Sequence, residues 1–188
     1  KSCDQLIIDG EIKSLYSYRK KFGIIFQDAV GALNPVYTVG NLLIEIARTK
    51  LDVSKTKAYE LVIQKLREFS FESPKEIMRQ YSFELSGGMC QRIMIIMAML
   101  GNPDYLIADE PTTALDVTVQ FQILKRIVEL KNKNNTGILF ITHDLGAVAE
   151  IADFVYIMKA GEIVEYNDVE NIFINPKHHY TEELINSI

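Results

Sequence analysis

The sequence predicts an α/β protein with a mostly parallel sheet and a helical insertion. Short apolar runs of strand length occur before residue 30 and again after residue 104, where they alternate with helical patterns. The stretch between them, about residues 36 to 100, carries apolar side chains at helical spacing. Strands that alternate with helices indicate a parallel sheet covered on both faces, so the helical middle is expected to be inserted between core strands.

The predicted strands are short apolar segments bounded by turn residues. Gln5–Asp9 ends at Gly10, and Phe22–Phe26 reads FGIIF before the chain is broken at Asn34 and Pro35. The later predicted strands are Tyr105–Ala108, Gly137–Thr142 (GILFIT), and the pair Phe154–Met158 and Glu162–Glu165 around an Ala160-Gly161 turn.

The predicted helices follow from apolar spacing and from capping residues. Val36–Thr49 carries a helical stripe, and Ser54 is expected to cap a helix that reaches Phe69. Ser73 to Glu76 has the pattern of a capping box with proline in the first helical position. The further predicted helices run from near Ser86 to about Leu100, over Val117–Lys131 as an amphipathic helix with Phe121, Leu124, Ile127 and Val128 on one face, and over Leu145–Ile151.

Composition excludes several classes of protein. The 20 basic and 25 acidic residues give a net charge of -5, which argues against a nucleic-acid partner. Cys3 and Cys90 have neither metal-ligand nor C-x-x-C spacing. The longest apolar run, Ile93 to Leu100, is far shorter than the roughly 20 residues of a membrane helix, so any membrane role is expected to come through a partner.

Two adjacent carboxylates, Asp109 and Glu110, follow the apolar strand that begins at Tyr105. Ligands of open α/β sheets lie at the carboxyl ends of the strands. There, Asp109 could hold Mg²⁺ through its water shell, and Glu110 could polarise an attacking water. The alternative is a strand that ends in a polar turn with both acids solvated.

A second pattern, Leu85-Ser86-Gly87-Gly88, precedes the longest apolar run. Serine and two glycines at the start of a helix leave backbone N–H groups free and allow close approach, which favours an anion. The alternative is a serine cap with a flexible glycine pair before a core helix.

Two polar residues follow other predicted strands. His143 comes directly after GILFIT, where it could reach a phosphate or orient a water; taken alone, it is better explained as a structural histidine. Gln27 follows FGIIF, where its amide could contact a metal or a water, or simply end the strand.

In this order the residues resemble the nucleotide-binding subunit of an ABC transporter. Gln27 matches the Q-loop, Leu85 to Arg92 (LSGGMCQR) the signature motif, and Leu106 to Pro111 (LIADEP) the Walker B motif with its glutamate. Ala114 to Asp116 matches the D-loop, and His143 matches the switch histidine. The resemblance covers essentially the whole chain.

The resemblance implies a P-loop NTPase-like (RecA-like) core with a mostly parallel sheet plus an inserted ABC α-helical subdomain. Residues 1–29 would belong to the core and end in the Q-loop, and residues 30–97 would form the helical subdomain with the signature motif. Residues 98–170 would complete the core with Walker B, D-loop and switch histidine. Residues 171–188 would begin a C-terminal extension.

The resemblance also implies roles for single residues, with ATP and Mg²⁺ as cofactors. Glu110, His143 and Gln27 would be catalytic, and Asp109 and Gln27 would serve the metal. The implied nucleotide contacts are Ser86, Gly87, Gly88, Gln91 and Asp116.

Three segments resemble the oligopeptide, dipeptide and nickel importers within the family: Phe26-Gln27-Asp28 with Leu33-Asn34-Pro35, Asp109 to Gln120 (DEPTTALDVTVQ), and Asn175 to Thr181 (NPKHHYT). The expected function is therefore the ATP-hydrolysing subunit of a peptide importer. Its expected partners are a second, related ATP-binding subunit in a head-to-tail dimer, membrane permease subunits and, indirectly, a substrate-binding protein. The expected location is peripheral, on the cytoplasmic face of the cell membrane.

One family motif is missing from these residues. No G-x-x-x-x-G-K-[ST] loop occurs, and the resemblance places it, with the adenine-stacking aromatic residue, upstream of Lys1. The N-terminal strands and Walker A are therefore expected to be missing, and the 188 residues alone are expected to be inactive. The alternatives are a truncated module that lends its signature face to an intact partner, a nickel importer subunit, and a soluble ATPase of DNA repair or translation.

Overall fold

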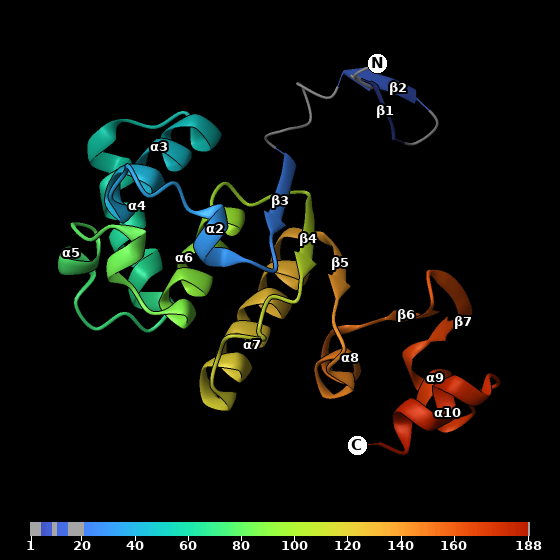
Figure 1. The fold of residues 1–188 in the computed structure, drawn as a ribbon. Helices are drawn as coiled ribbons and strands as arrows, with labels where there is room; N and C mark the ends of the chain where they lie inside the picture. Colours follow the sequence, from blue (N-terminus) through green and yellow to red (C-terminus); the bar gives the residue numbers. More distant parts are fainter. Residues whose placement is uncertain (1–4, 9–10, 15–20, 188) are drawn as a thin grey trace. The chain divides into compact units, whose positions relative to one another are not determined.

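The computed structural model describes residues 5–8, 11–14 and 21–187 (Figure 1). The chain divides into two compact units, one that ends at Ile141 and one that begins at Thr142, and each is described by itself. The predicted subdomain boundaries near residues 29, 97 and 170 stay predictions. Among the described residues, no helix combines the length and the apolar character needed to cross a membrane.

The first unit contains a parallel sheet in the order β3-β4-β5. Its strands are β3 (Phe22–Ile25), β4 (Tyr105–Asp109) and β5 (Gly137–Ile141), all three predicted from their apolar runs. An antiparallel hairpin of β1 (Gln5–Ile8) and β2 (Glu11–Ser14) lies earlier in the chain, and β2 was not among the predicted strands. The predicted turn residue Gly10 lies outside the described residues.

Helices fill the chain between β3 and β4, as the spacing predicts (Figure 1). Thr38 and Ser54 accept backbone N–H groups of Asn41 and Lys57 and so begin two of these helices. The elements of this part are α2 (Ala29–Ala32), α3 (Val39–Leu51), α4 (Lys55–Glu68), α5 (Pro74–Ile77), the 3₁₀ turn η2 (Ser82–Glu84) and α6 (Gly87–Met99). Helix α7 (Val117–Asn134) connects β4 to β5.

Two local predictions are wrong. The Ser73 side chain makes no capping hydrogen bond at α5, although Pro74 does occupy the first turn. On α7, Phe121 is 56% exposed, whereas Ile123 is buried, because the apolar residues of this helix span more than one face and packing chooses between them.

One core joins the inserted helices to the sheet. Ile93 and Ile96 of α6 belong to the same buried cluster as Ile25 of β3, Leu106 of β4 and Ile127 of α7. Helix α6 therefore packs directly against the strands, and this packing brings its first turn toward the segment that follows β4.

The second face of the sheet is open among the described residues. Ile24 is 44% exposed, Leu139 56% and Ile141 45%, while Leu106 and Ala108 on the core face are fully buried. The described part of the chain therefore does not meet the prediction that helices cover both faces.

The second unit is built on an antiparallel pair of strands. It contains α8 (Leu145–Ile151), β6 (Phe154–Lys159), β7 (Glu162–Asp168), α9 (Val169–Ile174) and α10 (His179–Ile185). The predicted turn between the strands is present, with φ of 51° at Ala160 and 86° at Gly161. Val155, Ile157 and Ile172 form the core of this unit.

Candidate functional site

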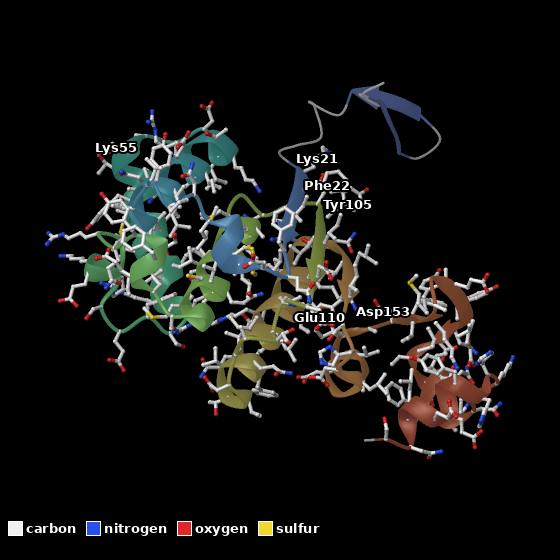
Figure 2. All side chains as sticks on the ribbon, in the orientation of Figure 1. Lys21, Phe22, Lys55, Tyr105, Glu110 and Asp153 are labelled. Carbon is white, nitrogen blue, oxygen red and sulfur yellow. The ribbon has the colours of Figure 1, made fainter. Side chains whose placement is uncertain are left out.

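The polar residues predicted to act together follow neighbouring strands of one sheet. Ile25 of β3 pairs with Ala108 of β4, so Gln27 and the Asp109–Glu110 pair extend beyond the same edge. Figure 2 shows Glu110 at this end of β4, opposite the end where Phe22 and Tyr105 stack with ring centroids 5.1 Å apart. The parallel pairing therefore gathers amide and carboxylate groups at one edge of the sheet.

Glu110 lies in a constrained turn. Its φ is 47°, a left-handed conformation that residues other than glycine rarely adopt. Its backbone N–H donates to the carbonyl of Ile141, 2.9 Å away, and its carboxylate accepts the hydroxyl of Thr113 at 2.9 Å. The backbone and the carboxylate of Glu110 are thus both held by neighbouring residues.

The signature segment, Leu85 to Arg92, begins helix α6 as predicted. Ser86 is the N-cap, and its Oγ accepts the backbone N–H of Met89 at 3.3 Å. Ser86 and Gly87 are exposed, so the first turn of this 13-residue helix presents backbone N–H groups to solvent. Such a turn favours an anion through its N–H groups and the helix dipole.

The two glycines of this segment have different surroundings. A Cβ atom at Gly87 would meet nothing within 4 Å. A Cβ atom at Gly88 would lie 3.0 Å from the backbone oxygen of Ala114. Gly87 therefore leaves open space beside the helix start, whereas Gly88 allows this turn to approach the segment that follows Glu110.

Gln91 and Asp116, two of the predicted nucleotide contacts, have structural partners. Gln91 is 1% exposed, and its Nε2 donates to the carbonyl of Pro111 at 3.0 Å. Asp116 is exposed and caps α7, with Oδ1 accepting the backbone N–H of Val119 at 3.0 Å. The interior position of Gln91 separates it from the exposed Ser86 and Gly87.

The segment that carries Gln27 connects β3 to α2. Gln27 is exposed, and Asp28 after it caps α2 by accepting the backbone N–H of Gly31 at 3.0 Å. The backbone N–H of Phe26 before it donates to the sulfur of Met94 at 3.4 Å. These contacts hold both ends of the segment while the Gln27 side chain faces solvent.

The oxygen atoms available at the site fit Mg²⁺ that is also coordinated by a phosphate, rather than a metal ion held by protein side chains alone. Among the described residues there is no group of three or more His, Cys, Asp or Glu side chains that could hold a metal ion. Asp109 and Gln27 nevertheless supply oxygen donors at the same edge of the sheet. Mg²⁺ is usually held by one or two carboxylates together with substrate phosphates, which matches this set.

His143 belongs to the second unit, where it is exposed just before helix α8. Asp144 after it caps α8, with Oδ1 accepting the backbone N–H groups of Gly146 at 2.9 Å and Ala147 at 3.2 Å. The hydroxyl of Thr142 accepts the backbone N–H of Asp144 at 3.1 Å. The backbone on both sides of His143 is thus fixed by local hydrogen bonds.

Sequence reasoning missed two residues near the site. Thr113, which donates to Glu110, stands in a Thr-Thr pair whose second member could have been recognised as a donor three residues after the acid. The guanidinium of Arg92 donates to the carbonyls of Phe69 and Ser70 at 3.1 and 3.2 Å and lies 4.3 Å from the ring centroid of Phe71. No pattern in the sequence indicates these contacts of Arg92.

Burial and charge act in opposite directions on Arg92. Burial lowers the pKa of its guanidinium, and the Asp116 carboxylate opposes that change. Through its hydrogen bonds, Arg92 connects the signature helix to the residues that follow α4.

Comparison with known proteins places the chain in a family. The model of the ABC transporter family matches residues 3–113, which is more than half of the chain. The chain belongs to the ABC transporter family. This finding agrees with the order of motifs described above.

Two relatives are named as oligopeptide transport ATP-binding proteins. OppD of Lactococcus lactis is 48% identical over 168 residues, which are 89% of this chain and 49% of that protein. AppD of Bacillus subtilis is 46% identical over 165 residues, 88% of this chain and 50% of that protein. The chain thus spans about half the length of these relatives.

Solved structures agree with the fold. A dimeric ATP-binding cassette bound to ADP and Pi superimposes with a TM-score of 0.77 at 23% identity, over 88% of this chain and 73% of that one. An ATP-binding subunit of an ABC transporter gives 0.75 at 25% identity, over 96% of this chain and 74% of that one. The predicted fold class, a P-loop NTPase-like core with an ABC helical subdomain, is confirmed.

Proposed function

We propose that this chain is part of the ATP-hydrolysing subunit of an ABC importer that takes up oligopeptides. The observation that carries the proposal is that the chain presents two groups together: an open helix start at Ser86 and Gly87, and the constrained carboxylate of Glu110. The first group suits a phosphate, and the second suits an attacking water. The relatives OppD and AppD are named as oligopeptide transport proteins, which supports a peptide cargo over nickel.

In this proposal each polar group has one task. Ser86, Gly87 and Gly88 bind the γ-phosphate of an ATP held mainly by the partner subunit. Glu110 accepts the proton of the attacking water, and His143 binds the γ-phosphate from its own position before α8. Phosphoryl transfer depends mostly on positioning and electrostatic stabilisation, which these groups provide.

The remaining groups serve the metal and the second site. Asp109 and Gln27 hold Mg²⁺ and its water shell, and bound Mg²⁺ neutralises charge on the phosphates. Asp116 couples the two nucleotide sites. It caps α7 and ends the 110–116 segment that carries Glu110, so a contact with Asp116 can change the position of that segment.

The proposed partners follow from this division of the site. A second, related ATP-binding subunit pairs head to tail with this one, and membrane permease subunits bind the helical part between residues 30 and 97. A substrate-binding protein delivers the peptide to the permease. The subunit is proposed to lie at the cytoplasmic face of the membrane as a peripheral protein, without a nucleic-acid partner.

The test is a Glu110→Gln substitution in the native full-length protein, assembled with its partner subunits. Single-turnover ATP hydrolysis should fall by roughly 10²–10⁴, with ATP binding retained, because general-base catalysis contributes about that factor. The matched control is Glu129→Gln on α7, where an exposed glutamate pairs with Arg126. A near-native rate in Glu110→Gln would sink the general-base role, and a native assembly that never hydrolyses ATP would favour the non-catalytic alternative.

A further inference from the structure

A buried hydrogen bond connects the signature helix to the segment that follows Glu110. Gln91 lies in the second turn of α6 and is 1% exposed. Its Nε2 donates to the carbonyl of Pro111, 20 residues away in sequence and 3.0 Å away in space. A buried amide without a hydrogen-bond partner raises the free energy of the folded state, so losing this bond would destabilise the protein.

The bond adjoins the constrained residue of the site. Glu110 has a φ of 47°, and such conformations persist only where the surroundings determine them. The backbone N–H of Glu110 is held by the carbonyl of Ile141 in β5, at 2.9 Å. The carbonyl of Pro111, the next residue, is held by Gln91 of α6. Glu110 is therefore fixed between the sheet and the signature helix.

A second contact joins the same two segments. Gly88, in the first turn of α6, comes so near Ala114 that a Cβ atom would lie 3.0 Å from the Ala114 oxygen. Helix α6 thus meets the 110–114 segment at two points, one through a side-chain amide and one through backbone packing. A displacement of the helix start must alter the support of Glu110.

We infer that Gln91 is a positioning residue that holds the Glu110 carboxylate in its working orientation by fixing the Pro111 carbonyl. The inference rests on the proposed function, and it assigns Gln91 a role inside the protein in place of the predicted nucleotide contact. Its consequence is that a displacement of the helix start at Ser86 and Gly87, where the ATP of the partner subunit would bind, reaches Glu110 in this chain's own site through the Gln91 side chain of the same helix.

The test uses Gln91→Met in the native full-length protein assembled with its partners. Methionine keeps the unbranched shape but cannot donate to the Pro111 carbonyl. The turnover rate kcat should fall about tenfold or more, while KM for ATP stays within about twofold. The reason is that the lost hydrogen bond disturbs the orientation of Glu110, which acts in the chemical step. The matched control is Gln64→Met on the exposed face of α4, where the glutamine donates to Glu68 at 2.8 Å, and its kcat should not change.

A double-mutant cycle separates this inference from the proposed function. Glu110→Gln alone reports on the general base. If Gln91 acts through Glu110, adding Gln91→Met to Glu110→Gln should cause no further loss of single-turnover rate. An equal loss from Gln91→Met in both backgrounds, or a raised KM with kcat unchanged, would overturn the positioning role while leaving the general base intact.

A second variant keeps the inference testable if Gln91→Met fails to fold. Gln91→Glu has nearly the same shape, and its carboxyl group can donate to the Pro111 carbonyl only when protonated. Its kcat, taken as a ratio to the native kcat at each pH, should rise as pH falls. A ratio that stays constant with pH and well below one would overturn the inference, whereas a ratio near one throughout would mean that the buried carboxyl group stays protonated and keeps its donor.

Discussion

The hydroxyl of Thr113 donates to the carboxylate of Glu110 at 2.9 Å and lies 3.2 Å from the backbone oxygen of the same residue. One side chain therefore contacts both the acid and the backbone that carries it. Because Glu110 has a positive φ of 47°, this contact fixes a conformation that the residue would not hold alone. Thr113 contacts the Glu110 carboxylate directly, whereas Gln91 holds the carbonyl of the next residue, Pro111.

The first prediction concerns this hydroxyl. Thr113→Val keeps the shape of the side chain but removes the donor, so single-turnover ATP hydrolysis by the full-length protein should fall about fivefold or more. Thr113→Ser retains the hydroxyl and should stay within about twofold of the native rate. A Thr113→Val protein that hydrolyses ATP as fast as Thr113→Ser would show that the hydroxyl does not orient Glu110.

The second prediction compares two neighbouring glycines. Alanine at Gly88 would place a Cβ atom 3.0 Å from the backbone oxygen of Ala114, whereas alanine at Gly87 meets nothing within 4 Å. Thermal or denaturant unfolding should therefore find Gly88→Ala less stable than Gly87→Ala by about 1–3 kcal/mol, the usual cost of overpacking.

The same pair of variants tests the anion site at the helix start. Gly87→Ala should keep the native stability but lower ATP hydrolysis, because its methyl group enters the open space beside Ser86 that the phosphate needs. Gly87→Ala thus tests phosphate binding without a change in packing, whereas Gly88→Ala tests the close approach to Ala114 through its stability. Equal stability of the two would contradict the close approach at Ala114, and native hydrolysis by Gly87→Ala would count against phosphate binding there.

The sequence predicts the local features of this site well. The cap at Ser86 and the strand that ends at Asp109 both follow from patterns of a few adjacent residues, and both are present. The pairing of Gln91 with Pro111 depends on how α6 packs against the sheet, so no local pattern contains it. The prediction for the apolar face of α7 was wrong for the same reason, since packing buries Ile123 and leaves Phe121 exposed.

Short elements were also hard to predict. Helix α2 has four residues and depends on Asp28, which caps it by accepting the backbone N–H of Gly31. The Ser73 cap was expected from its neighbours, yet α5 begins without a side-chain hydrogen bond from that residue. Elements of one turn gain little from internal hydrogen bonds, so tertiary contacts decide whether and where they form.

In the second unit, Glu165 of β7 holds the segment that leads into α10. It is 8% exposed, and its carboxylate accepts the backbone N–H groups of Lys177 at 2.8 Å and His178 at 3.0 Å. Burial acts to raise the pKa of Glu165, but the nearby Thr181 hydroxyl and the backbone N–H groups of Lys177 and His178 outweigh it, so the pKa lies below its ordinary value. The charged form of Glu165 is therefore the form that stabilises this segment.

The third prediction follows from the sign of that shift. A carboxyl group with a lowered pKa in the folded state contributes its full stabilisation above its unfolded pKa of about 4.3, and loses it as pH falls through the folded value. Amide hydrogen exchange over residues 175–187, corrected for intrinsic rates, should thus show native protection falling below about pH 4. In Glu165→Gln, these amides should be less protected at neutral pH, and their protection should fall less with acid, because glutamine does not titrate. The control is Glu162→Gln at an exposed position of β7, which should keep the native profile. Parallel profiles for the native protein and Glu165→Gln would mean that the acid sensitivity of this segment comes from another group.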